Sequence, residues 1–349
     1  MKTTTSATTS RKVLKSLTAA VLGVTLSLGA VSSFAADINN RLIRFGYGLS
    51  EDSKQGESVK YFIEEMKRLS DGKFKVKGFA NASLGNEMQM QNALIGGAQE
   101  MMMGATSSLV GIDKRFGIWD LPFLFDKAEV ADKVYDGKVG QELLDGLQSQ
   151  GLVGLVYWEN GFRDLTNSKR PIEKMSDMDG VKLRVMQNPM YLDLFNSMGA
   201  NAIPMAFSEL FTALETGAVD GQENPYTTIQ SSKFYEVQKY MSLTHHVYSP
   251  WVMLISKSFW DKLSDDEKAI VKQAAVASRD YERKLSREQA AESLAFLKQH
   301  MQVNDVPPAE LDKMRAKAKV VVDAQAKELG EDLVKQLFAA IEEAKQQTN

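Results

Sequence analysis

Two hydrophobic periods alternate in the first part of this chain, and this alternation is the feature that most constrains its fold. Residues 43–47 have the composition of a strand, and beyond Ser53 apolar side chains recur at steps of three and four as far as Leu69, as on the buried face of a helix. Residues 73–77 alternate between lysine and apolar residues, and residues 87–95 are again helical in pattern. This order of strands and helices predicts an α/β domain.

Two later apolar segments are predicted to divide the chain. Residues 152–158 (LVGLVYW) form the first strand, which we expect to end at residues 159–161, and residues 250–255 (PWVMLI) form the second. A chain of 349 residues is long enough for two domains. We therefore expect the chain to cross between domains at these two strands. From Ser264 onward the pattern is mainly helical.

The N-terminus has the pattern of a signal peptide. Four basic residues precede residue 16, no acidic residue precedes Asp37, and residues 17–31 are almost wholly apolar or small. This apolar run is too short to span a bilayer comfortably. Ser33 and Ala35 follow with the small-x-small spacing that signal peptidase requires, so we expect cleavage after Ala35 and export to the periplasm.

Composition and missing motifs argue against several classes of function. Lysine and arginine total 42 against 45 aspartate and glutamate, without a basic block, so we expect no nucleic-acid partner. The chain has no cysteine, and therefore no disulfide, no cysteine nucleophile and no lipid-accepting thiol. The common hydrolase, nucleotide-binding and metalloprotease motifs are also missing. His245 and His246 are adjacent, and neighbours in a strand face opposite ways, so we expect no metal site.

Two arginines in the middle of the chain are candidate anion-binding residues. Arg163 follows Gly161 and Phe162, and Arg184 lies in residues 181–185, where valine and leucine alternate with charged residues. The planar guanidinium can hold a carboxylate through two parallel hydrogen bonds. An arginine in a strand is also often a solvent-facing charge, and composition and spacing leave this choice open.

Four segments together resemble one protein family. They are residues 121–125 (LPFLF), 161–172 (GFRDLTNSKRPI), 180–185 (GVKLRV) and 198–225 (MGANAIPMAFSELFTALETGAVDGQENP). They resemble the solute-binding proteins of TRAP-type (tripartite ATP-independent periplasmic) transporters. The resemblance covers essentially the whole mature chain in the same order, and the block that ends in VDGQENP is highly specific.

The resemblance implies a two-lobed periplasmic binding protein of the α/β class, type II-like, with a ligand cleft between the lobes. Lobe I would comprise residues 36–160 plus about 250–289, and lobe II residues 161–249 plus about 290–349. Long C-terminal helices would brace both lobes. Such a protein is not an enzyme; it captures a small organic acid anion and delivers it to the membrane permease subunits.

The resemblance also implies roles for particular residues. Arg184, in the GxKxRV strand, would hold the ligand carboxylate, and Arg163 would face the cleft. Asn224, in QENP, would contribute a hydrogen bond, and Phe207 would pack on the ligand. No catalytic, cofactor-binding or metal-binding residue is implied.

Three further residues are predicted with less support from the motifs. Glu87 follows the Leu-Gly turn, where family members contact polar groups of the ligand, while Asn188 and Trp158 are included on position alone. One loop departs from the family: where many members read F-P-x-x-Q-L-G, residues 79–85 read FANASLG. Because this loop borders the ligand, the sequence defines the fold better than the ligand.

Two cleft arginines predict an anionic ligand, since a buried carboxylate must be paired. Glu87 and Asn224 would suit hydroxyl groups, so a sugar acid such as a uronate or aldonate is the first expectation. A C4-dicarboxylate is second, and a small hydroxy or keto acid is third. We expect a monomer that needs no cofactor. The alternatives are a sensor subunit that binds the same ligand, and a periplasmic lyase or hydrolase of acidic sugars, which would need a positioned acid–base pair.

Overall fold

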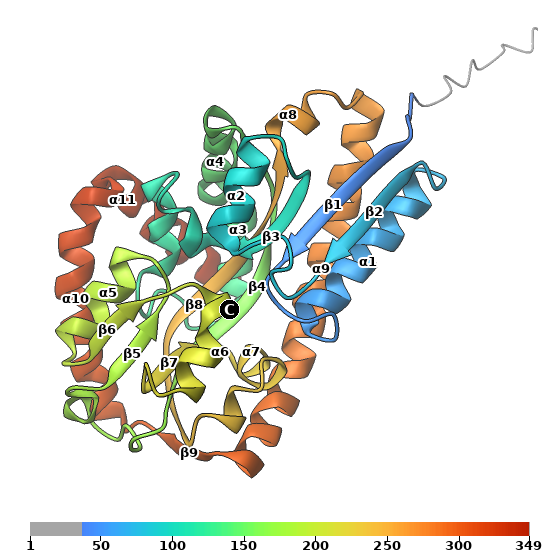
Figure 1. The fold of residues 1–349 in the computed structure, drawn as a ribbon. Coiled ribbons are helices and arrows are strands. Elements are labelled where there is room, and N and C mark those ends of the chain that lie inside the picture. Colours follow the sequence, from blue (N-terminus) through green and yellow to red (C-terminus); the bar gives the residue numbers. More distant parts are fainter. Residues whose placement is uncertain (1–36, 349) are drawn as a thin grey trace, which may run out of the picture. The chain divides into compact units, whose positions relative to one another are not determined.

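The structure is a computed structural model that describes residues 37–348. The predicted leader and the cleavage site after Ala35 lie outside the described residues. The strands are β1 (Arg41–Tyr47), β2 (Phe74–Phe79), β3 (Met101–Ala105), β4 (Leu152–Asn167), β5 (Lys182–Val185), β6 (Asn201–Pro204), β7 (Gly221–Asn224), β8 (Tyr240–Ser256) and β9 (Gln302–Asp305). They form one sheet in the order β2-β1-β3-β8-β4-β7-β5-β6, with β9 paired to β8 (Figure 1).

Helices connect the strands and cover the sheet. The α-helices are α1 (Lys54–Leu69), α2 (Glu87–Ile95), α3 (Ala128–Asp136), α4 (Lys138–Gly146), α5 (Pro189–Ser197), α6 (Phe207–Glu215), α7 (Tyr226–Ser231), α8 (Lys257–Trp260), α9 (Asp265–His300), α10 (Pro308–Leu329) and α11 (Glu331–Gln346). The 3-10 helices are η1 (Thr106–Leu109), η2 (Lys114–Asp120), η3 (Leu147–Gln150), η4 (Met175–Met178) and η5 (Phe234–Glu236). The predicted order of strands and helices in the first part of the chain is confirmed.

Local sequence explains where these helices begin. The Ser53 side chain accepts a hydrogen bond from the backbone N–H of Gly56 and so caps α1, which satisfies one of the free donors of the first turn. In α9, Ser264 and Glu267 form a reciprocal capping box,. The buried face of α1 includes Val59, Phe62 and Met66, as the spacing predicts.

The strands β4 and β8 are the longest of the sheet and join its two ends. Figure 1 shows them between the parallel strands β1–β3 and the strands β5–β7. The predicted end of β4 at residues 159–161 is wrong: the strand continues to Asn167 through a register shift between Glu159 and Gly161. Gly161 has a φ of +115°, a conformation that only glycine adopts without strain. The proposed crossing between lobes at this point stays a prediction.

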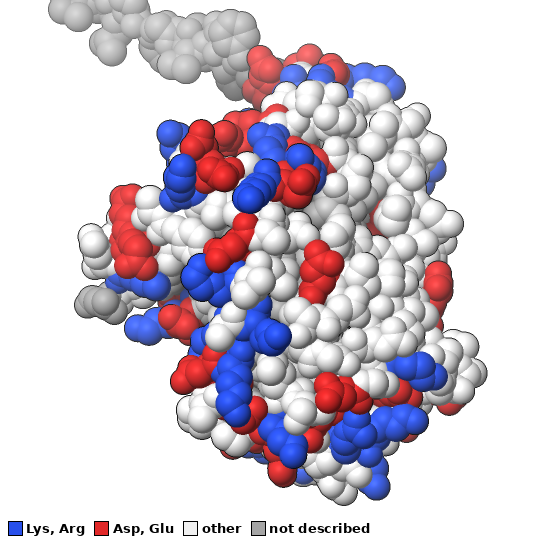
Figure 2. All heavy atoms as spheres, turned by 90° about the vertical axis from the view of Figure 1, so that its left-hand side faces the viewer, with Lys and Arg blue, Asp and Glu red and all other residues white. Residues whose placement is uncertain are grey.

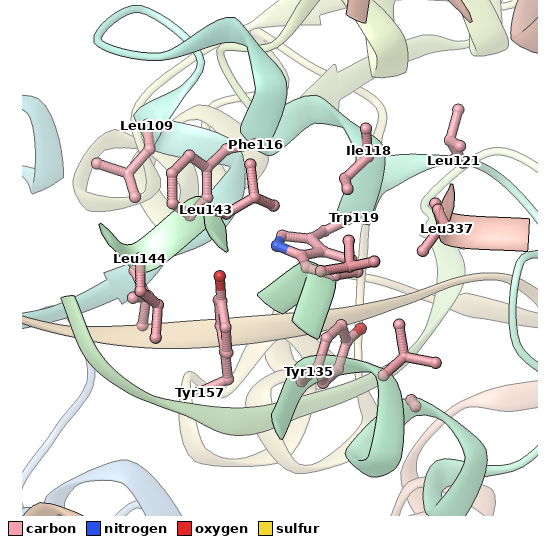
Figure 3. Packing of buried hydrophobic residues seen from close by; sticks show 14 of the residues in the cluster. Leu109, Phe116, Ile118, Trp119, Leu121, Tyr135, Leu143, Leu144, Tyr157 and Leu337 are labelled. Carbon is pink, nitrogen blue, oxygen red and sulfur yellow. The ribbon is translucent and has the colours of Figure 1, made fainter. Parts of the chain in front are cut away.

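A large hydrophobic core lies where η2, α3, α4 and β4 meet (Figure 3). At its centre the fully buried ring of Trp119 lies edge-on to Tyr135, with ring centroids 4.8 Å apart, and also contacts Tyr157. Tyr157 donates its hydroxyl hydrogen to the carbonyl of Gly140 at 3.1 Å. Leu337 of α11 joins the same cluster, so the C-terminal helices are tied to the sheet by apolar packing.

The helical character predicted for the last part of the chain is confirmed. Helix α9 runs for 36 residues and packs along α1, and α10 packs on α5. Among residues 37–348, none of the helices combines the length with the apolar character that a membrane span requires. On the face shown in Figure 2, basic and acidic side chains are interspersed, and a broad area carries few charges.

Candidate functional site

One cavity brings together five of the seven predicted site residues. They are Arg163, Arg184, Asn224, Phe207 and Glu87. These residues come from β4, β5, β7, α6 and α2, so the cavity is built from both ends of the sheet. It encloses about 760 Å³ free of protein atoms, part of which is open to solvent. A concave site lined by apolar side chains and a few convergent polar groups is typical of small-molecule binding.

Arg184 is positioned by its strand and by one carbonyl. Leu183 and Val185 are buried in the core on β5, which fixes the backbone. The guanidinium donates from Nε and Nη2 to the carbonyl of Met205, at 2.9 and 2.7 Å. Nη1 is buried and has no hydrogen-bond partner among the described residues. The arginine is therefore oriented by the protein and still has donors available.

The charge of Arg184 is costly in this environment. Burial is the main effect that lowers the pKa of Arg184 to about 10; the charge of Glu223 opposes it, and the neighbouring charge of Arg163 adds to it. Its pKa remains well above neutral, so the guanidinium is charged. It forms no salt bridge within the described residues. A buried cation without a paired anion is unstable, so this site favours an anionic ligand.

Arg163 differs from Arg184 because a carboxylate already neutralises it. Its Nε and Nη2 both donate to the carboxylate of Glu223, and Nη2 also donates to the main-chain carbonyl of Glu223 at 2.7 Å. Burial alone would raise the pKa of Glu223, but the charge and hydrogen bonds of Arg163 and His246 outweigh burial and lower it to about 2. The third guanidinium nitrogen of Arg163, Nη1, is not hydrogen-bonded to Glu223; it donates to Oγ of Ser249 at 3.4 Å.

The adjacent histidines face different partners, as predicted. His246 is buried, with Nε2 3.0 Å from Oε2 of Glu223 and Nδ1 2.8 Å from Oγ1 of Thr244. His245 instead lies 2.7 Å from Oδ1 of Asp164. Within residues 37–348, no group of three or more metal-ligating side chains has the arrangement to hold an ion. His246 therefore supports Glu223, which in turn holds Arg163.

The other three predicted residues that line the cavity add polar and aromatic groups. Glu87 opens α2, and its Oε1 accepts a hydrogen bond from the backbone N–H of Ala105 at 2.8 Å. Burial raises the pKa of Glu87, against the lowering effect of its hydrogen bonds and of the two arginines. Asn224 donates from Nδ2 to Oε1 of Gln222. Phe207 begins α6 and packs against Phe234.

Two predicted residues do not line this cavity. Trp158 is fully buried in a hydrophobic cluster that also contains Val156 and Trp251, and it is Trp251 that reaches the cavity. Asn188 caps α5 by accepting from the N–H of Met190, and it donates to Oδ2 of Asp120 at 2.6 Å. Apolar packing and helix capping thus occupy these two side chains.

Sequence reasoning missed several residues that line the cavity. The polar ones include Ser108, Asn160, Gln187, Ser208 and Thr228. Asn160 lies next to the Gly161 motif, and Ser208 next to Phe207, so adjacency to the motifs could have suggested both. The remaining three, Ser108, Gln187 and Thr228, lie outside the quoted motifs, so no signal in the sequence indicated them.

Comparison with known proteins gives a consistent family. A family model described as bacterial extracellular solute-binding protein, family 7, matches residues 45–329. The 2,3-diketo-L-gulonate-binding periplasmic protein of Escherichia coli is 39% identical over 272 residues, which cover 78% of this chain and 82% of that protein.

Solved structures show the same fold. The sugar acid binding protein of Advenella mimigardefordensis, solved in complex with galactonate, is 49% identical and has a TM-score of 0.87, covering 88% of this chain and 100% of that one. A TRAP periplasmic solute-binding protein of Sulfurospirillum deleyianum with bound succinate is 30% identical and has a TM-score of 0.83, covering 86% and 99%. The predicted fold, a two-lobed periplasmic binding protein, is confirmed. The chain belongs to the bacterial extracellular solute-binding proteins of family 7, the binding components of TRAP transporters.

Proposed function

We propose that this protein captures a monocarboxylate sugar acid, an aldonate or uronate, in the periplasm and delivers it to the permease subunits of a TRAP transporter. The observation that carries this proposal is the guanidinium of Arg184, which is buried and charged, forms no salt bridge among the described residues and has Nη1 unbound. A ligand carboxylate would supply both the missing charge and the missing acceptor.

The balance of charge in the cavity favours one carboxylate over two. Glu223 neutralises Arg163, so Arg163 has little charge left for a second carboxylate. Another buried cation, Lys54, donates to the carbonyls of Glu159 and Asn160 and to Ser286, and it does not line the cavity. Succinate would therefore place its second carboxylate without a matching cation, which is costly in a buried site.

The remaining polar lining suits hydroxyl groups. Glu87, Asn224 and Ser208 line the same cavity as Arg184, and such groups bind hydroxyls better than they bind hydrocarbon. Among the relatives described above, the two named for sugar acids are 49% and 39% identical to this chain, and the one with succinate is 30% identical. These identities support the same choice of ligand.

Further parts of the proposal concern export, architecture and the absence of catalysis. Residues 1–35 would be the signal peptide, lobe I would comprise 36–160 plus about 250–289, and lobe II would comprise 161–249 plus about 290–349. The protein would act as a monomer without a cofactor. It would not transform its ligand, because Glu87 and Glu223 are engaged by Ala105 and Arg163 rather than arranged as a free acid–base pair.

A thermal-shift screen followed by calorimetric titration tests the ligand class. A ligand that binds only the native state raises the melting temperature, so D-galactonate and D-glucuronate should raise it more than succinate or a neutral hexose at the same concentration. Binding of succinate with higher affinity than either sugar acid would contradict the monocarboxylate proposal. Conversion of D-galactonate during prolonged incubation, followed by NMR, would instead favour an enzyme.

A further inference from the structure

Three residues that line the cavity have buried side-chain atoms with no hydrogen-bond partner among the described residues. They are Nη1 of Arg184, Oδ1 of Asn160 and Oγ1 of Thr228. Most buried polar atoms in proteins are hydrogen-bonded, so each exception calls for a physical reason. The first of these atoms is a donor, the second is an acceptor, and the third can be either.

The side chain of Asn160 is held in place by β8. Only 3% of Asn160 is exposed. Its Nδ2 donates to Oγ of Ser249 at 3.2 Å, and the same Oγ lies 3.4 Å from Nη1 of Arg163. The amide is therefore linked through one hydroxyl group to a cavity arginine, and its oxygen is left unbound.

The backbone at Asn160 is held as firmly as the side chain. Nζ of Lys54 donates to the carbonyls of Asn160 and Glu159, at 2.7 and 3.2 Å. The N–H of Glu159 donates to Oε2 of Glu282 at 2.7 Å. Helices α1 and α9 thus fix the segment of β4 that carries Asn160. A group fixed in this way can select a ligand without a large cost of ordering.

On the basis of the proposed function, we propose that Asn160 is a specificity-determining residue. Its side-chain oxygen accepts a hydrogen bond from the ligand hydroxyl on the carbon next to the carboxylate. Oδ1 requires a donor, which neither a carboxylate nor a keto oxygen provides. A hydroxyl provides one. Asn160 and Arg184 line the same cavity, and in the proposed pose the carboxylate lies on Arg184 while the hydroxyl of the neighbouring carbon meets Oδ1 of Asn160. The site thereby distinguishes 2-hydroxy acids from their deoxy and keto counterparts.

The energetic reason lies in the unpaired acceptor. When a ligand without the hydroxyl fills the cavity and excludes water, Oδ1 is left buried and unbound, which is the costly case for a polar group. We expect the protein to bind a 2-hydroxy acid about tenfold more tightly than its 2-deoxy counterpart, as is typical for one neutral hydrogen bond at a desolvated site.

The test compares two matched pairs of acids by calorimetric titration of the full chain after export. The pairs are D-galactonate with 2-deoxy-D-galactonate, and malate with succinate. The variants are Asn160→Ala, Asn160→Ser in case the alanine variant folds poorly, and Asn92→Ala as control, since Asn92 is exposed on α2. Asn160→Ala should weaken binding of the hydroxy acid about tenfold and that of the deoxy acid less than about threefold.

Three results would contradict the proposal or its basis. Equal losses for both members of a pair would mean that Asn160 acts only by holding Ser249 and the strand. An unchanged affinity for the hydroxy acid, in a variant whose melting temperature is unchanged, would mean that the amide does not contact the ligand. Failure of the unsubstituted protein to bind any of the four acids would instead contradict the proposed capture of organic acids, and with it the role of Asn160.

Discussion

The guanidinium of Arg184 has one edge bound to the protein and another edge free. Nε and Nη2 share the carbonyl of Met205, so the edge that remains for a ligand carries Nη1 and the second hydrogen of Nη2. Two parallel donors match a carboxylate, whereas a lysine ammonium would have to serve Met205 and the ligand from one point. The geometry of this residue, and not only its charge, should therefore set the affinity.

This argument predicts a graded response to substitution at Arg184. Arg184→Lys should weaken binding of D-galactonate although the charge is kept, and Arg184→Ala should weaken it more, by about 2–5 kcal/mol, as for truncation of one member of a buried charge pair. Arg170→Lys is the control, because Arg170 is exposed and lies outside the cavity. Calorimetric titration gives the order. Near-native affinity in Arg184→Lys would show that the arginine supplies charge alone.

Glu223 makes the stability of the fold sensitive to acid. Its pKa is lowered to about 2 in the folded protein from 4.5, so the ionised carboxylate stabilises the fold above pH 4.5. This contribution should be lost as the pH falls from about 4.5 to 2. Glu223→Gln should lower the free energy of unfolding at neutral pH by about 3–5 kcal/mol, because Arg163 is left buried without its anion.

Chemical denaturation at a series of pH values checks the prediction for Glu223. The unsubstituted protein should lose stability through the acid range more steeply than Glu223→Gln does. Glu236→Gln is a matched control, since Glu236 is exposed and forms no salt bridge with the described residues. Parallel pH profiles for the unsubstituted protein and Glu223→Gln would show that another carboxylate dominates the acid response.

At the scale of the element, β4 combines a register shift with a glycine that no other residue replaces without strain. A Cβ at Gly161 would lie at ordinary contact distance from the ring of Pro225, 3.5 Å, and from Oε1 of Glu159, 3.9 Å, so space is not the obstacle. The φ of +115° is. Gly161→Ala should therefore destabilise the protein by about 1–3 kcal/mol through backbone strain.

Urea denaturation of Gly161→Ala measures this cost, with Gly111→Ala as control because a Cβ at Gly111 would meet nothing within 4 Å. Because Asn160 and Arg163 flank Gly161 on the strand, the Gly161→Ala variant should also bind D-galactonate more weakly. Equal stability of the two variants would mean that β4 adapts locally at the register shift.

The sequence predicted helices better than it predicted the two long strands, for a physical reason. The bounds of α2 and the caps of α1 and α9 follow from local signals, namely apolar spacing and capping side chains. In β4, the buried residues Asn160, Arg163 and Asp164 have the composition of a loop. Their hydrogen-bond partners lie on other elements, such as Glu223 on β7 and His245 on β8. The sequence pattern of β4 alone therefore cannot predict these contacts.

The candidate site was predicted in part, and by motif more than by chemistry. Composition left Arg163 and Arg184 undecided, and the resemblance placed both in a cleft. Neither approach separated the arginine that Glu223 neutralises from the one that has no salt bridge, because that difference depends on how β4, β5 and β7 lie side by side. The hydrogen bond from Asn160 to Ser249 likewise exists only in the folded sheet.

At the scale of the whole molecule, the cavity residues lie on both sides of the two long strands. Glu87 and Ser108 belong to the part of the chain assigned to lobe I, while Arg184 and Phe207 belong to the part assigned to lobe II. A ligand that contacts both groups gains most when they approach each other, and hinge closure is a common transition in binding proteins of this kind. Closure would also exclude water, which would strengthen the expected pairing of Arg184 with a carboxylate.

We therefore expect the protein to become more compact when it binds a sugar acid. Small-angle X-ray scattering at saturating D-galactonate should give a smaller radius of gyration than the unliganded protein. Arg184→Ala serves as the comparison, because at the same ligand concentration it should bind little and keep the larger radius. The size of the change depends on how far the unliganded protein is open, since a ligand shifts an equilibrium only by its difference in affinity for the two states. An unchanged radius at proven saturation would mean that the ligand enters a cavity that is already closed, and affinity would then depend on the fixed positions of Arg184 and Asn160 alone.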